Sequence, residues 1–106
     1  MTQTTSPTQR SVQLIYRAFP GAGDPVATER VHIEVAGDDL EICELAFAHT
    51  NLYQGEVWDA LQPLPAERTH TSLSVGDVVV VDGRAYECAS IGFNRATQFD
   101  TTDASN

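Results

Sequence analysis

A run of four valines followed by a tight-turn pair constrains the fold of this chain more than any other feature. Residues 77–81 are nearly all β-branched, and Asp82-Gly83 supplies the pair that a two-residue β-hairpin favours. Residues 84–91 then alternate again, with Tyr86 and Cys88 on one side. Because the valines occupy both faces of the first arm, we expect a central strand that a helix covers on one side.

Two earlier segments show the same period of two, which indicates strands. Their inward positions are Val12, Leu14 and Tyr16 in residues 11–19, and Val31, Ile33 and Val35 in residues 29–35. Residues 20–25 between them are mostly Gly and Pro, which is typical of a turn. We therefore expect these two strands to form an antiparallel pair.

A helix over residues 40–50 is predicted to follow the second strand. Asp38 or Asp39 can cap its start, and Leu40, Cys43 and Phe47 follow helical spacing on an expected inner face. Residues 57–61 could form one or two helical turns or a short strand before two prolines interrupt the chain. The predicted fold class is α+β, a small antiparallel sheet in the order β-β-α-β-β with one main helix packed on one face.

The length of 106 residues suits a single domain. We expect this domain to span residues 11–95, with disordered tails at residues 1–10 and 96–106, the second of them acidic. No apolar run reaches the roughly 20 residues of a membrane helix, and the chain does not open like a secretory signal. The sequence therefore predicts a cytoplasmic protein without membrane association.

The charge balance separates classes of partner. Six arginines and no lysine face 15 acidic residues, which gives a formal net charge of −9. This charge repels phosphate backbones, so direct nucleic-acid binding is not expected. The same composition is typical of proteins from salt-loaded cytoplasms. A GC-rich genome also replaces lysine with arginine, so the composition fits both sources.

The residues that usually carry catalysis or bind metals form no motif. His32, His49 and His70 lack ligand spacing among themselves and with the two cysteines. Cys43 and Cys88 occupy expected core positions, where burial raises a thiol pKa, so we interpret both as small apolar residues. We predict a protein that is not an enzyme and that has no cofactor and no metal site.

Two stretches contain side chains that turns and caps do not account for. Residues 50–58 set Asn51, Tyr53 and Trp58 around a glycine, and an exposed Trp/Tyr pair is typical of a binding hot spot. The alternative is that the two aromatic rings complete the core. Residues 69–77 carry a second polar set that could bind a ligand or could satisfy the loop's own backbone. This set consists of His70, Ser72, Ser74 and Asp77.

The second stretch and the strands after it resemble the YodL-like domain, which occurs in proteins of plasmids, integrative elements and phages. The resemblance covers about residues 50–93. It rests on Ser72-Leu73-Ser74-Val75-Gly76-Asp77-Val78-Val79, Tyr86, Ser90-Ile91-Gly92-Phe93 and Thr50-Asn51-x-Tyr53-x-Gly55-x-x-Trp58. Leu73 and Ile91 depart from the family pattern, in which Met and Phe are commoner. The resemblance implies an accessory protein of a mobile element and assigns no catalytic residue.

Three hypotheses about function follow. The first is a protein-interaction module whose contact surface comes from Asn51, Tyr53, Trp58 and the loop of residues 69–77, with Trp58 exposed to solvent. The second is an acidic decoy that mimics nucleic acid, which requires carboxylates gathered along one face. The third is an enzyme or small-ligand binder built around Ser72, Ser74, Asp77 and His70. A homodimer through an unpaired sheet edge is compatible with each.

Overall fold

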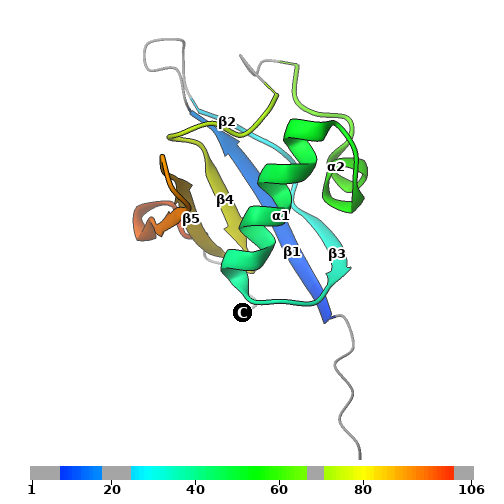
Figure 1. Cartoon of the computed structure of the whole chain (residues 1–106), viewed down its shortest axis with the longest axis horizontal. Coiled ribbons are helices and arrows are strands. Elements are labelled where there is room, and N and C mark those ends of the chain that lie inside the picture. The colour runs from blue at the N-terminus through cyan, green and yellow to red at the C-terminus, as the bar shows by residue number, and fades with distance from the viewer. Residues whose placement is uncertain (1–7, 18–24, 67–70, 102–106) are drawn as a thin grey trace, which may run out of the picture.

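The computed structural model describes residues 8–17, 25–66 and 71–101. Its centre is a six-stranded antiparallel sheet in the order β2-β1-β4-β5-β6, with β3 also pairing with β1 (Figure 1). The long β1 (Thr8–Tyr16) pairs on one side with β4 (Val78–Val81). On its other side β3 (Val31–Val35) pairs with its first half and β2 (Val26–Ala27) with its end. The predicted α+β class and the antiparallel pairing of the first two strands are confirmed.

The predicted hairpin is present at Asp82-Gly83. Both residues have positive φ, 51° and 85°, as a type I′ turn requires, and they join β4 to β5 (Arg84–Cys88). The return strand ends at Cys88 rather than at Ile91. The chain then turns back and forms β6 (Phe93–Arg95) at the edge of the sheet, a strand that the sequence analysis did not predict.

Two helices form a layer on one face of the sheet. Figure 1 shows α1 (Asp39–Leu52) in front of β1 and β4, with α2 (Glu56–Leu61) beside it on the β3 side. Asp38 caps α1, accepting from the Glu41 backbone while the Glu41 carboxylate accepts from the Asp38 backbone. The predicted helix is therefore confirmed, and residues 57–61, for which helix and strand were both open, are helical.

The inner face of α1 differs from the prediction. Ile42, Cys43 and Ala46 are fully buried, whereas Leu40 is 48% exposed and Phe47 is 37% exposed. Apolar residues lie on more than one side of this helix, so its own spacing does not select the side that packs. The position of the helix over β1 and β4 makes that selection.

The opposite face of the sheet is covered by the segment that the sequence analysis assigns to an acidic tail. Val78 and Val80 point to this face and pack with Ala85, and Phe99 from η1 (Thr97–Phe99) packs on them. Asp100 accepts from the Ala85 backbone. The domain boundary at residue 95 is therefore corrected, because the second apolar face of β4 must also be covered. Likewise, β1 begins at residue 8, inside the other predicted tail.

An ion-pair network centred on Asp39 joins the start of α1 to the sheet. Its carboxylate accepts from Arg10 at 2.5 Å, from Arg84 at 2.6 and 3.0 Å, and from the Tyr86 hydroxyl at 2.6 Å. Arg10 also donates to Asp82. The Arg84 hydrogen bond, with smaller contributions from Tyr86 and Arg10, holds the pKa of Asp39 below its usual value despite partial burial.

Candidate functional site

The corner between the two helices determines how residues 50–58 are presented. Tyr53 ends α1 in the left-handed conformation, φ 57° and ψ 37°, and its N–H donates to the His49 carbonyl. Gly55 follows with φ 119°, a region that L residues rarely enter. A Cβ at Gly55 would lie 2.4 Å from the His49 ring, so only glycine fits between the helices.

His49 also supports the start of α2. Gly55 occupies the cap position of this helix and has no side chain, so His49 Nδ1 accepts the hydrogen bond from the Val57 N–H at 3.1 Å. Val57 is fully buried and Leu61 is nearly so. These contacts fix α2 against the core and hold Trp58 at a defined place on the surface.

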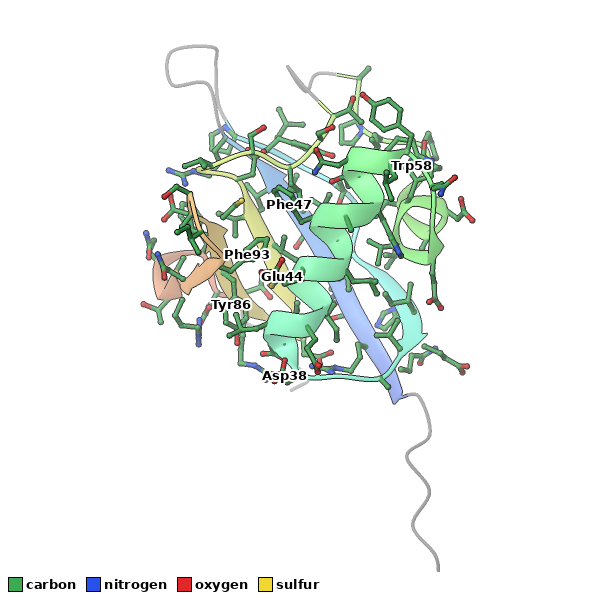
Figure 2. The ribbon with its side chains drawn as sticks, in the orientation of Figure 1. Asp38, Glu44, Phe47, Trp58, Tyr86 and Phe93 are labelled. Carbon is green, nitrogen blue, oxygen red and sulfur yellow. The ribbon has the colours of Figure 1, made fainter. Side chains whose placement is uncertain are left out.

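Tyr53 and Trp58 stack at this corner, with ring centroids 5.3 Å apart and an interplanar angle of 21°. Figure 2 shows Trp58 beside the end of α1. Trp58 is half-buried, Tyr53 is 58% exposed and the neighbouring Leu52 is 63% exposed. We call Leu52, Tyr53 and Trp58 the aromatic corner. All three side chains are large and apolar, and each is at least partly exposed.

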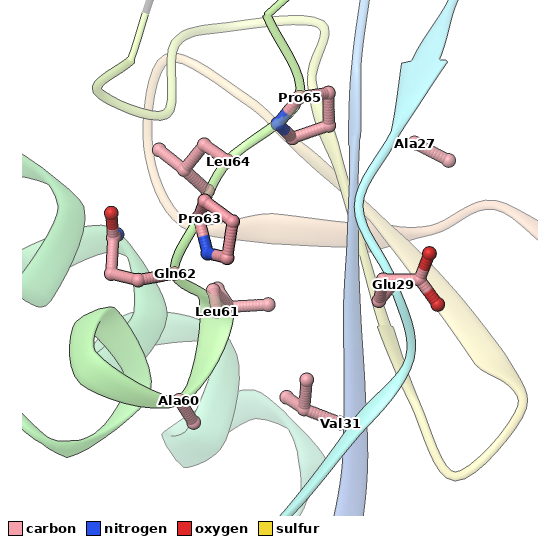
Figure 3. Close-up of a pocket in the computed structure, with 9 residues that line it drawn as sticks. All are labelled: Ala27, Glu29, Val31, Ala60, Leu61, Gln62, Pro63, Leu64 and Pro65. Carbon is pink, nitrogen blue, oxygen red and sulfur yellow. The ribbon is translucent and has the colours of Figure 1, made fainter.

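A pocket of about 400 Å³ lies between the end of α2 and the β2–β3 edge (Figure 3). Residues 60–65 form one wall, and Ala27, Glu29 and Val31 from the β2–β3 edge form the other. Its lining is apolar apart from the Glu29 carboxylate and the Gln62 amide. The sequence analysis did not predict this pocket because its walls come from segments some 30 residues apart.

The structure divides the predicted site residues into two groups. Asn51 is exposed two residues before Tyr53, and its side-chain amide donates to the Phe47 carbonyl at 2.7 Å. Leu52 completes this group. It was not predicted because the expected helix ended at residue 50, two residues too early.

The second predicted group belongs to the framework of the fold. Asp77 is fully buried, and its carboxylate accepts from the backbone N–H of Arg17 at 2.6 Å and of Ser74 at 2.9 Å. Ser72 donates to the Thr50 carbonyl and Ser74 to the Ser72 carbonyl, both at 3.3 Å. The placement of Asp77 on a contact surface is therefore wrong, because a buried carboxylate that orders its own loop cannot contact a partner.

His70 lies outside the described residues, and the pocket at the end of α2 is not lined by residues 71–77. The part of this loop that is described is tied to the core. The Tyr16 hydroxyl donates to the Thr71 carbonyl at 2.8 Å, and the Leu73 N–H donates to the buried Thr50 hydroxyl at 3.2 Å. These bonds support the interpretation in which the loop's polar groups satisfy backbone groups.

The interpretation of the cysteines as core residues is confirmed. Cys43 and Cys88 are both unpaired and buried. Burial, reinforced by Asp39 and Glu44, raises the pKa of Cys43 to about 12, and burial also raises the pKa of Cys88. Both thiols therefore stay protonated at neutral pH and are weak nucleophiles.

Residues 8–17, 25–66 and 71–101 contain neither a group of potential metal ligands nor a helix that could span a membrane. No three His, Cys, Asp or Glu side chains within these ranges are grouped so that they could hold a metal ion. No helix in the same ranges is long and apolar enough to cross a membrane. No protein-family model, curated protein or solved structure matches this chain. The resemblance to the YodL-like domain stays a prediction.

Proposed function

We propose that this chain is a non-catalytic protein-binding module that contacts its partner through the aromatic corner. The observation that carries the proposal is the Tyr53–Trp58 stack at the surface. Tyr53 and its neighbour Leu52 each keep more than half of their side-chain surface in contact with solvent. Aromatic side chains dominate the energetics of protein interfaces because they bury a large area and lose little conformational entropy.

The rigidity of the corner favours binding further. Tyr53 is held by its backbone bond to His49, and Trp58 is held by α2, whose start His49 also caps. A surface that is already ordered avoids most of the entropy cost of arranging side chains on association. The aromatic corner therefore resembles the centre of an interface more than a loosely packed part of a core.

The charge around the corner indicates the chemistry of the partner. Glu56 and Asp59 are exposed on α2, and the carbonyl end of α1 adds partial negative charge. We infer a partner that has an apolar patch with lysine or arginine at its rim, because such cations pair with carboxylates and also bind over aromatic faces.

The biological setting is part of the same proposal and rests on the resemblance to the YodL-like domain. It describes an accessory protein of a plasmid, integrative element or phage that acts in the cytoplasm. The two unpaired, buried cysteines suit a compartment in which thiols stay reduced.

One observation favours the acidic decoy as a second candidate. Exposed carboxylates gather on the helical layer, where Asp38, Glu41 and Glu44 follow α1 and Glu56 and Asp59 lie on α2. A decoy predicts that binding depends on these charges and falls with salt, whereas the aromatic corner predicts that binding depends on Tyr53 and survives salt.

A pull-down from host lysate, at low and at multimolar salt, separates the two candidates. The test variant is Tyr53→Asn, because asparagine tolerates the left-handed conformation and removes only the ring. The control is Leu40→Ala, which removes an exposed apolar side chain at the far end of α1. We expect a partner that the wild type and the control retain and that Tyr53→Asn loses. Retention by Tyr53→Asn would contradict the proposal.

Tryptophan fluorescence checks the geometry without a partner. Trp58 is the only tryptophan, and half-burial under Tyr53 predicts emission between that of a fully buried and that of a fully exposed indole. Tyr53→Asn should shift the emission to longer wavelength because the stacked ring no longer shields the indole. Emission typical of a fully buried indole in the wild type would count against the aromatic corner.

A further inference from the structure

The edge strand β6 and the groove beside it form a second surface, at the edge of the sheet opposite β2 and β3. The groove has a volume of about 190 Å³ and lies between α1 and the β5–β6 hairpin. Its lining includes Glu44 and Phe47 from α1 and Cys88 and Phe93 from the hairpin. In Figure 2 the labelled side chains of Glu44, Phe47 and Phe93 lie together between α1 and this part of the sheet.

The backbone of β6 has unpaired groups along its outer side. The N–H of Ala89 donates to the Gly92 carbonyl, and the N–H of Ala96 donates to the Ala85 carbonyl, both at 2.9 Å. These bonds identify Ala89 with Gly92 and Ala85 with Ala96 as hydrogen-bonded pairs of the β5–β6 ladder. Such pairs alternate in an antiparallel ladder, so the N–H and C=O groups of Phe93 and Arg95 point away from β5. No hydrogen bond from a described residue reaches them.

Apolar side chains surround this edge. Phe47 and Phe93 meet edge to face, with ring centroids 6.4 Å apart, and Phe47 keeps more than a third of its surface in solvent. Ile91 at the tip of the hairpin is 90% exposed. An exposed edge with apolar neighbours is a template for an added strand.

The charge of the groove selects among the strands that could be added. Glu44 is exposed and makes no hydrogen bond or ion pair with a described residue. Side chains one helical turn apart, such as Glu44 and Phe47, are about 5–6 Å apart. Alternate side chains on one face of a strand are about 6.6 Å apart, which is a close match. An apolar residue followed two positions later by a basic one would therefore reach Phe47 and Glu44 together.

The same charges disfavour a second copy of this chain as the occupant. Each copy has a net charge of −9, so two copies repel. Four arginines already pair with carboxylates of their own chain and are not available to Glu44 of a neighbour. They are Arg10, Arg17, Arg84 and Arg95.

We propose that β6 binds an extended basic peptide by strand addition, with an apolar side chain of the peptide in the groove at Phe47 and Phe93 and a lysine or arginine at Glu44. The backbone groups of Phe93 and Arg95 supply the hydrogen bonds, and the groove supplies the selectivity for the apolar-x-basic pattern. This surface is distinct from the aromatic corner, so a partner could engage one without the other.

The probe is the blocked heptapeptide Thr-Thr-Leu-Thr-Lys-Thr-Thr, with a version that has Glu in place of Lys as its charge control. Both are titrated into the ¹⁵N-labelled full chain. We expect the lysine peptide to shift the amide signals of Phe93 and Arg95, and the glutamate version to bind several-fold more weakly. Glu44→Gln should weaken the lysine peptide by about two- to five-fold, as suits an exposed ion pair.

A matched pair of variants tests the strand addition itself. Arg95→Pro removes the outward N–H of β6 and leaves the backbone hydrogen bonds between β5 and β6 in place. Arg95→Ala loses the same side-chain bonds, to the Ala85 carbonyl and to Asp100, but keeps that N–H. Binding should fall more than ten-fold in Arg95→Pro relative to Arg95→Ala, with both variants keeping a dispersed spectrum. Equal affinity of the two variants, or no shift at Phe93 and Arg95, would overturn the proposal. A dimer that only Arg95→Pro abolishes would also overturn it by assigning the edge to a second copy.

Discussion

Replacing Asp39 by asparagine is the most informative single test of how this fold is held together. Asp39 lies in the first turn of α1 and accepts hydrogen bonds from Arg10 on β1 and from Arg84 and Tyr86 on β5. Its carboxylate therefore joins the helical layer to two strands that are not neighbours in the sheet. Asparagine keeps the shape of the side chain and removes its charge.

The magnitude follows from the exposure of each pair. Arg10 and Asp39 are each only 13% exposed, and a charge-assisted hydrogen bond of this kind contributes about 1.5–3 kcal/mol. A carboxylate in the first turn of a helix adds about 0.3–1 kcal/mol. The Arg84 side chain is 47% exposed, so its pair adds about 0–1 kcal/mol. Because the amide can still accept one bond, we expect Asp39→Asn to lower the free energy of unfolding by about 2–4 kcal/mol.

The pH dependence supplies an independent check. The pKa of Asp39 is lower in the folded protein than in the unfolded chain, so its contribution is fully present above the ordinary aspartate pKa of about 3.9. It is lost as the pH falls below that value toward the lowered pKa. The difference in unfolding free energy between wild type and Asp39→Asn should therefore shrink between about pH 5 and pH 2.

Urea unfolding at several pH values measures both quantities. The control is Glu87→Gln, which replaces an acid that faces Arg17 at 3.6 Å in an exposed pair and should change stability by less than about 0.5 kcal/mol. A loss for Asp39→Asn no larger than that of the control at neutral pH would refute the reasoning. A large loss that stays constant down to pH 2 would show that packing, and not the ion pairs, accounts for the effect.

Two further substitutions test the corner and the second face of the sheet. Gly55→Ala should destabilise the chain by about 2–4 kcal/mol, because alanine is strained at φ 119° and its Cβ would meet the His49 ring at 2.4 Å. Thermal unfolding measures the loss of stability. A change below about 0.5 kcal/mol would contradict the close approach of Gly55 to His49. Phe99→Ala should cost about 1–3 kcal/mol, because the ring covers Val78 and Val80 and lies under the Arg17 guanidinium, 4.5 Å from its centroid. If residues 96–106 were a disordered tail, urea unfolding would give the same stability for Phe99→Ala and the wild type.

The corrections to the predicted site share one cause. Asp77 and Tyr53 both look like candidate contact residues in the sequence, because each is a side chain with binding chemistry near a glycine. Asp77 is buried, and its carboxylate accepts from the N–H of Arg17, which directly follows β1 and lies 60 positions earlier in the sequence. Tyr53 stays exposed because it ends a helix at the surface. Contacts between segments distant in the chain decide which polar and aromatic residues remain accessible.

The sequence by itself determined the features that depend on neighbouring residues. Asp82-Gly83 specifies its hairpin because two adjacent positions need positive φ, and the Asp38-Asp39 pair specifies a helix start because either carboxylate can cap the first turn. The structure then selects Asp38, which forms a capping box with Glu41. Only the tertiary structure decided which side of α1 packs, that Phe99 covers the second face of β4, and that Tyr53 stacks on Trp58. The physical reason is that burial depends on what lies opposite a side chain in space, and a local pattern does not contain that information.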